Sequence, residues 1–177
     1  WLSLALIDSR NRTLRWLTCF EQADALHGGA EWPEPPLQRI GGIGWFQEYW
    51  IARHVQRARG ESADAASLRL PSCEPRADAW FDPARRAAWG PATAPEADAV
   101  RGYLQATLET TLDLLAAAAE TDASLYVFRL ALLAEDRLAE TLAEAAAAVG
   151  IDPVDAAAPQ GSALARRERE PLWMPAR

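Results

Sequence analysis

The sequence predicts an all-α protein built as a four-helix bundle. Four segments carry apolar residues at helical spacing, and no run alternates apolar and polar residues as a half-buried strand would. One long proline-rich segment separates the second expected helix from the third. A chain of 177 residues has the length of one domain, or of one domain and a tail, and can bury a sizeable core. Long amphipathic helices with one long connection are typical of a bundle.

The first helix is expected over residues 2–26. Its apolar stripe is mixed, because Arg10 and Thr13 fall among leucines and an aromatic residue at helical spacing. The helix should end before Gly28 and Gly29, because glycine readily adopts the backbone conformation that follows a helix C-terminus.

The second helix is expected over residues 37–59, ending at Gly60. Aromatic side chains crowd about one and a half turns of it: Trp45, Phe46, Tyr49 and Trp50. Residues 60–95 are rich in proline and show little periodicity, apart from a short helix or turn expected in "RADAWFDPARRAAW". A connection of this length in a compact domain tends to be functional or to lie over a cleft.

The third and fourth helices have clear beginnings. The third opens at Thr93 or Pro95 with acidic residues after it, as a helix N-terminus favours. The fourth is expected to have Asp122 as its N-cap and to run to Val149, before Gly150. Residues 1–150 would then form the bundle.

Residues 151–177 are expected to form a linker or tail, because they are rich in alanine, proline and arginine. The segment finishes with the apolar run "PLWMP". An apolar patch of this kind indicates a neighbour, either a further domain in cis or a protein in trans.

Charge and hydropathy exclude two classes of partner. The formal net charge is −7, and an acidic surface repels phosphate backbones, so no nucleic-acid partner is expected. No apolar run is long enough to span a bilayer, so no membrane partner is expected either. Two cysteines are too few for a disulfide framework, and we expect a cytoplasmic protein.

Six segments of the chain form a recognisable series: "LALIDSRNRTLRWLTCFE", "GGIGWFQEYWIARHVQRARG", "ADAWFDPAR", "YLQATLETTLDLL", "LYVFRLALLAEDRLAETL" and "PLWMPA". Together they resemble the N-terminal DinB-like helical domain of ergothioneine-type sulfoxide synthases, and especially of the related selenoneine synthases. The likeness covers nearly the whole chain. It implies a DinB-like four-helix bundle with a long loop between the second and third helices and an extended C-terminal tail.

The resemblance also implies a metal centre that this chain has lost. The family consists of non-haem Fe(II) enzymes that join sulfur or selenium to the imidazole of trimethylated histidine (hercynine). One histidine of the second helix and two at i, i+4 on the fourth hold the iron. The matching positions here are Gly42, Ala134 and Leu138, none of which can coordinate a metal. Glu135 and Glu140 still match the family pattern, but no cofactor is expected in this chain.

Other candidate site residues have a structural and a functional interpretation. The aromatic residues around Trp45 and Tyr49 would either bind a quaternary ammonium ion by cation–π attraction or fill the core, which is the favoured interpretation. Glu48 is the best candidate for a buried acid, because aromatic residues flank it. Trp45, Glu48, Tyr49 and Glu135 are together the candidate pocket residues.

The remaining ionisable residues indicate surface positions. The chain has two histidines, and His27 and His54 are each expected at the surface or at a helix C-terminus rather than at a metal. Asp136 and Glu140 share a helix face, and with Arg129 and Arg137 nearby they predict a solvated, partly ion-paired face.

The expected function follows from the resemblance. The chain would be the N-terminal helical domain of a selenoneine- or ergothioneine-synthase-like protein, whose parent reaction forms a C–Se or C–S bond on hercynine. It would be inactive by itself, because it lacks the metal ligands and the formylglycine-generating-enzyme-like, lectin-related domain that follows in the family. The alternative is a non-catalytic helical module for binding or assembly.

Overall fold

The computed structural model describes residues 1–28, 34–88, 90 and 92–151. Within these residues the protein is all-α, as the sequence predicts, and no β-strand occurs among them. The α-helices are α1 (Leu2–Gln22), α2 (Pro36–Gln47), α3 (Ala77–Phe81), α4 (Ala97–Ala116) and α5 (Asp122–Ala148). Shorter turns are the π-helical η1 (Glu48–Ala52) and the 3-10 segments η2 (Arg57–Ser62) and η3 (Pro83–Ala88).

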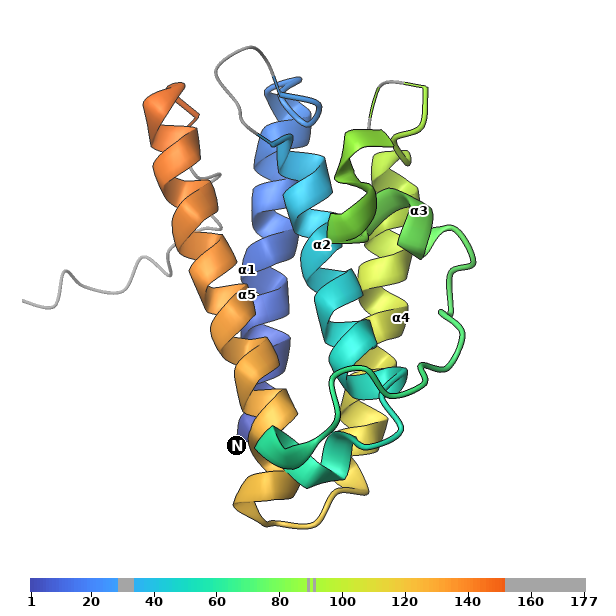
Figure 1. The fold of residues 1–177 in the computed structure, drawn as a ribbon. Helices are drawn as coiled ribbons and strands as arrows, with labels where there is room; N and C mark the ends of the chain where they lie inside the picture. The colour runs from blue at the N-terminus through green and yellow to red at the C-terminus, as the bar shows by residue number, and fades with distance from the viewer. Residues whose placement is uncertain (29–33, 89, 91, 152–177) are drawn as a thin grey trace, which may run out of the picture.

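The long helices lie side by side (Figure 1). α1 and α5 run in one direction, whereas α2 and α4 run in the other. α1 packs mainly against α5 and α2 mainly against α4, and contacts of α1 with α4 and of α2 with α5 join the two pairs. The faces that meet follow the predicted spacing, although the buried face of α1 includes Arg10 and Thr13 as well as Leu6, Leu17 and Phe20.

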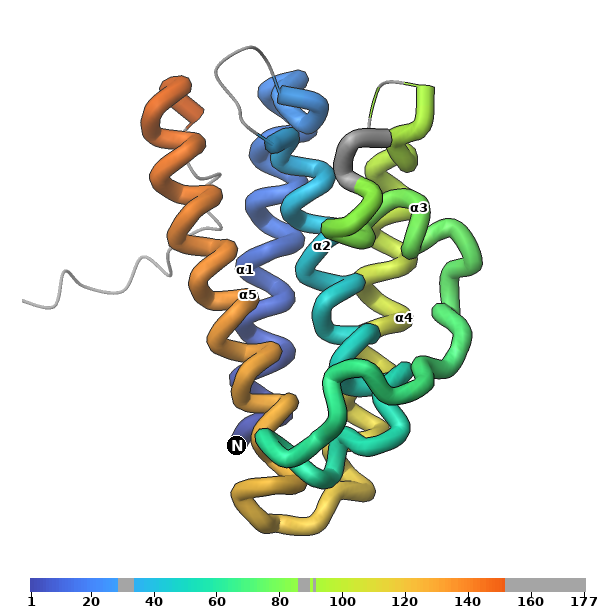
Figure 2. Tube along the Cα trace, viewed as in Figure 1, coloured from blue at the N-terminus to red at the C-terminus, as the bar shows by residue number. Residues whose placement is uncertain are grey.

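The connection between α2 and α4 packs over the helices. Figure 2 shows it turning at the end of α2, passing beside α5 and returning to α3. η2 contacts α5, and α3 contacts α2. Gly60 lies in η2 with φ +57°, and a Cβ there would come within 2.9 Å of the Ala123 carbonyl oxygen. Glycine is therefore required where the connection touches α5.

The prediction of a second helix over residues 37–59 is wrong for the second half of that range. The α-helix ends at Gln47 and continues as the single π-helical turn η1, in which the Arg53 N–H donates to the Glu48 carbonyl at 2.9 Å. Beyond it the Arg53 carbonyl accepts from the Leu70 N–H at 2.9 Å. The backbone therefore leaves the helix because the connection supplies its hydrogen-bond partners.

The other boundaries differ by a few residues. α1 ends at Gln22 rather than near residue 26, and α4 begins at Ala97 rather than at Thr93 or Pro95. The N-cap of α5 is Thr121, whose hydroxyl accepts from the Ser124 N–H at 3.2 Å. The short helix predicted in the connection is present as α3 and η3.

None of the helices in the described residues is both long and apolar enough to cross a bilayer. Ile151 packs against the core after α5. The rest of the predicted linker, residues 152–177, lies outside the described residues.

Candidate functional site

Three positions that are distant in the sequence share one pocket. Gly42 on α2 and Ala134 and Leu138 on α5 all line a cavity of about 330 Å³. Ala134 and Leu138 are four residues apart, so they lie on the same face of α5, one turn from each other. The positions that the resemblance relates to metal ligands therefore face a common space.

The glycines of α2 explain where this space lies. A Cβ on Gly41 would come within 2.1 Å of the Phe81 ring, and a Cβ on Gly44 within 2.8 Å of Leu104. A Cβ on Gly42 would meet no neighbouring heavy atom within 4 Å. α2 therefore approaches its neighbours closely on either side of Gly42 and leaves the pocket open at Gly42 itself.

The residues at these positions do not fit a bound iron ion. Glycine has no side chain, and the side chains of Ala134 and Leu138 are hydrocarbons, so none offers a lone pair to a metal. Among the described residues no group of three or more histidine, cysteine, aspartate or glutamate side chains is placed to hold a metal ion. No iron-dependent step can be assigned to the side chains that line this pocket.

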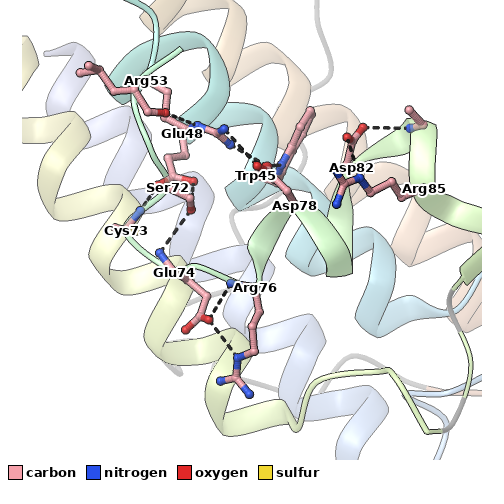
Figure 3. Close-up of polar contacts among 12 residues, drawn as sticks. Trp45, Glu48, Arg53, Ser72, Cys73, Glu74, Arg76, Asp78, Asp82 and Arg85 are labelled. Carbon is pink, nitrogen blue, oxygen red and sulfur yellow. Dashed lines mark hydrogen bonds and ion pairs between the residues drawn. The ribbon is translucent and has the colours of Figure 1, made fainter.

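Trp45, a candidate pocket residue, forms part of the pocket wall in a fixed orientation. Its indole N–H donates to Asp78 Oδ1 at 2.7 Å, and Arg53 donates to both oxygens of Asp78 at 2.6 and 3.1 Å (Figure 3). The hydrogen bond from Arg53 lowers the pKa of Asp78, and the same bond raises the pKa of Arg53. The charged pair anchors the ring of Trp45 to α3.

Glu48 is buried, as the sequence predicts, but it lies away from the pocket. Its carboxylate accepts from the Ser72 hydroxyl at 2.7 Å, the Cys73 backbone N–H at 2.6 Å and the Tyr103 hydroxyl at 2.8 Å. Figure 3 shows Glu48 beside Ser72 and Cys73 of the connection. The acid therefore ties the connection to α2 and α4.

Burial and this contact together keep the nearby Cys73 thiol protonated. Cys73 is exposed, but partial burial of the thiol group and, next, the Glu48 carboxylate raise its pKa to about 11. Burial and Glu48 likewise raise the pKa of Tyr103. Both groups remain neutral near pH 7, and Cys73 is not a reactive thiolate.

Tyr49 does not line the pocket, and an arginine side chain of the same chain lies over its ring. The Trp45 and Tyr49 rings stack with centroids 4.7 Å apart. The guanidinium carbon of Arg69 lies 4.3 Å from the centroid of the Tyr49 ring and 5.1 Å from that of the Trp50 ring. Within the predicted aromatic cluster, Arg69 therefore lies over Tyr49 and Trp50, whereas Trp45 and Phe46 face the pocket.

Glu135 is held in a buried polar network that sequence reasoning missed. Arg10 donates to the two carboxylate oxygens of Glu135 at 2.6 and 3.2 Å, and also to Gln47 Oε1 at 2.6 Å and to the Leu104 carbonyl. Arg10 and Glu135 are each 1% exposed. The guanidinium therefore joins α1, α2, α4 and α5. The signal in the sequence was the position of Arg10 within an apolar stripe.

The histidines and the acidic pair of α5 form no site. His27 is exposed, as expected, but His54 is fully buried, so the expectation of a surface position is wrong for His54. Asp136 accepts from the Ser9 hydroxyl at 2.7 Å and pairs with Arg12 of α1, while Glu140 is exposed. Asp136 thus contributes to helix packing.

His54 should make stability depend on pH. Burial, and then the charge of Arg69, lowers its pKa below the ordinary value of 6.5, outweighing the opposite effect of Asp64. Because the unfolded chain binds the proton more readily, the free energy of unfolding should fall as pH drops from about 6.5 to the lower pKa of the folded state. It should be fully restored above pH 6.5.

Urea unfolding at a series of pH values will measure this dependence, with His54→Gln as the control that cannot titrate. The variant should lose the decline that begins at about pH 6.5, whatever its absolute stability. Parallel pH profiles for the original chain and the variant would contradict the assignment.

Comparison with protein-family models gave no match, and comparison with curated proteins gave no significant match. The features that bear on function are therefore structural: the pocket between α2 and α5, its fixed aromatic wall, and the polar network around Arg10.

Proposed function

We propose that this chain is the DinB-like four-helix-bundle domain of a selenoneine- or ergothioneine-synthase-like protein, retained as a scaffold without a metal centre. The observation that carries the proposal is the common pocket of Gly42, Ala134 and Leu138. These residues come from helices far apart in the sequence. If their match to the metal-ligand positions of the family were accidental, nothing would require them to lie together.

Two further features support the proposal. The long connection lies between the second and third long helices, where the resemblance expects it. Glu135, which follows the first lost ligand position, remains buried and bound to Arg10. The parent enzymes use Fe(II) to form a C–S or C–Se bond, and this chain alone would not catalyse that step, because it supplies no ligands at the three positions. Its proposed partner is a lectin-like domain in cis or a protein in trans, in the cytoplasm.

A non-catalytic binding module is the second candidate. The observation that favours it is the Gln38 side chain, which lines the same pocket, is 6% exposed and has no hydrogen-bond partner among the described residues. Its amide is not among the fully buried atoms, so it is open to the pocket and can form hydrogen bonds with a ligand there. The two candidates are compatible, since a scaffold that has lost its metal can keep a ligand.

Restoring the three imidazoles tests the first candidate. The triple variant Gly42→His, Ala134→His, Leu138→His should bind Co²⁺, because two imidazoles one turn apart and a third from the facing helix can hold one cation. Gly42→His has space for its side chain. Cobalt binding will be followed by visible absorption and by calorimetry.

The matched control places a histidine pair of the same spacing on the exposed face of α5. Leu133→His with Arg137→His provides this pair, since both residues are exposed. The triple variant should bind Co²⁺ at least about tenfold more tightly, equivalent to roughly 1.4 kcal/mol. If the triple variant bound Co²⁺ no better than the exposed pair, the proposed arrangement of α2 and α5 would be refuted.

A further inference from the structure

Two polar side chains of the pocket wall, Gln38 and Arg39, carry hydrogen-bond donors that no hydrogen bond uses. Gln38 is 6% exposed, and no hydrogen bond joins its amide to any other residue that the structure describes. The Nε atom of Arg39 is also buried without a hydrogen bond, although it lies 3.5 Å from Glu34 Oε2. The Arg39 Nε atom is a fully buried donor without a hydrogen bond, which is uncommon in folded proteins, whereas the Gln38 amide is open to the pocket. Their position beside a cavity points to a ligand that accepts hydrogen bonds.

Part of the apolar wall of the pocket is aromatic, and two of its rings are held in place. Trp45, Phe46 and Phe81 line it. The indole of Trp45 is anchored by Asp78, and the ring of Phe81 stacks on Tyr103 with centroids 5.7 Å apart and an interplanar angle of 15°. A preformed aromatic wall favours binding of a flat ring, because little side-chain freedom is lost when the ligand arrives.

We propose that this pocket binds a small organic monocarboxylate with a single aromatic ring. The carboxylate accepts hydrogen bonds from the Arg39 guanidinium and the Gln38 amide, and the ring lies against Trp45 and Phe46. A charge-assisted hydrogen bond from an arginine is stronger than one between neutral groups, which favours a carboxylate over a neutral acceptor. Glu34 lies beside Arg39 and offsets its positive charge. The pocket wall therefore lacks the excess positive charge that a dianion would need.

The size of the pocket restricts the ligand further. Its volume of about 330 Å³ lies at the lower end of the range for small-molecule pockets, roughly 300–1,000 Å³. This volume suits one ring with a short side chain. The proposal uses no metal ligand and no part of the relation to the synthases, so it can fail or succeed independently of that relation.

Phenylacetate is a suitable probe, with phenylacetamide as its neutral analogue and benzylamine as a cationic one. Titration of the full chain, followed by calorimetry and by ligand-observed nuclear magnetic resonance, should show saturable 1:1 binding of phenylacetate. Phenylacetamide should bind at least about tenfold more weakly, because it cannot form the charged hydrogen bond. Absence of saturable phenylacetate binding at millimolar concentration, or equal or tighter binding of either analogue, would overturn the proposal.

Three variants locate the binding. Arg39→Gln should weaken phenylacetate binding at least about tenfold, while Arg129→Gln, at an exposed arginine that pairs with Asp122, should leave it unchanged. Gly42→Leu should abolish binding by filling the pocket, with circular dichroism and thermal unfolding confirming that the helices remain. Unchanged binding in Arg39→Gln or Gly42→Leu would place the ligand elsewhere and contradict the assignment.

Discussion

Replacing Arg10 with alanine should destabilise the protein by about 3–5 kcal/mol, the range found when one partner of a buried ion pair is removed. Arg10 and Glu135 are both 1% exposed, so the variant would leave the Glu135 carboxylate without water or a counter-charge. It would also remove the donors to Gln47 Oε1 and to the Leu104 carbonyl. The loss of stability is therefore expected to come from polar groups on α2, α4 and α5 that are left buried without a partner.

Urea unfolding provides the measurement, and Arg12→Ala provides the control. Arg12 lies only two residues after Arg10 on the same helix, yet its side chain is 41% exposed and pairs with Asp8 and Asp136 near water. Its removal should cost no more than about 1 kcal/mol. Equal destabilisation by the two substitutions would show that Arg10 does not hold the long helices together.

A double substitution separates the ion pair from the packing. Arg10→Met with Glu135→Leu removes both charges and keeps apolar volume, and such replacements are often neutral or stabilising. The double variant should therefore be more stable than Arg10→Ala. A double variant that is less stable than Arg10→Ala would mean that packing around the side chains, rather than the unpaired charge, determines the loss.

Alanine substitutions at the adjacent glycines Gly41 and Gly42 of α2 should have opposite effects on the stability of the protein. Gly41→Ala should destabilise the protein, because its Cβ would lie 2.1 Å from the Phe81 ring, which is 4% exposed and stacked on Tyr103. Overpacking of this kind costs about 1–3 kcal/mol or more. A contact as short as 2.1 Å places the cost toward the upper end of this range, above the gain of about 1 kcal/mol that alanine brings to a helix interior.

Gly42→Ala is the matched substitution, because it brings the same helix-propensity gain without a clash. It should leave the thermal midpoint unchanged or raise it, whereas Gly41→Ala should lower it. Phe81→Leu should relieve part of the loss in Gly41→Ala by removing the ring. Identical midpoints for the two alanine variants would contradict the described approach of α2 to α3.

The sequence predicted those features of the fold that depend on residue spacing within one segment. The long helices, the short helix around Trp80 and the burial of Glu48 could all be read from apolar periodicity and flanking aromatics. The shared face of Ala134 and Leu138 follows from the helical repeat. That Gly42 meets them in one pocket followed only from the family resemblance, because nothing local relates α2 to α5.

The features that were missed depend on contacts between distant segments. α2 turns into η1 and ends because Leu70 supplies the partner for Arg53, and His54 is buried beneath the same connection. Arg69 covers Tyr49 for the same reason. A proline-rich segment with little periodicity gives no indication of which helix it will contact, so these contacts could not be inferred from spacing.

The proposed relation to the synthases depends most directly on the convergence of positions 42, 134 and 138 on one pocket. A crystal structure of the triple-histidine variant with cobalt, with the metal located by anomalous scattering, will measure it. We expect one metal ion bound by the imidazoles at all three positions, at about 2.0–2.1 Å as is usual for histidine ligands of a divalent ion such as zinc. A metal ion held by the α5 pair alone, with the imidazole at position 42 pointing elsewhere, would contradict it.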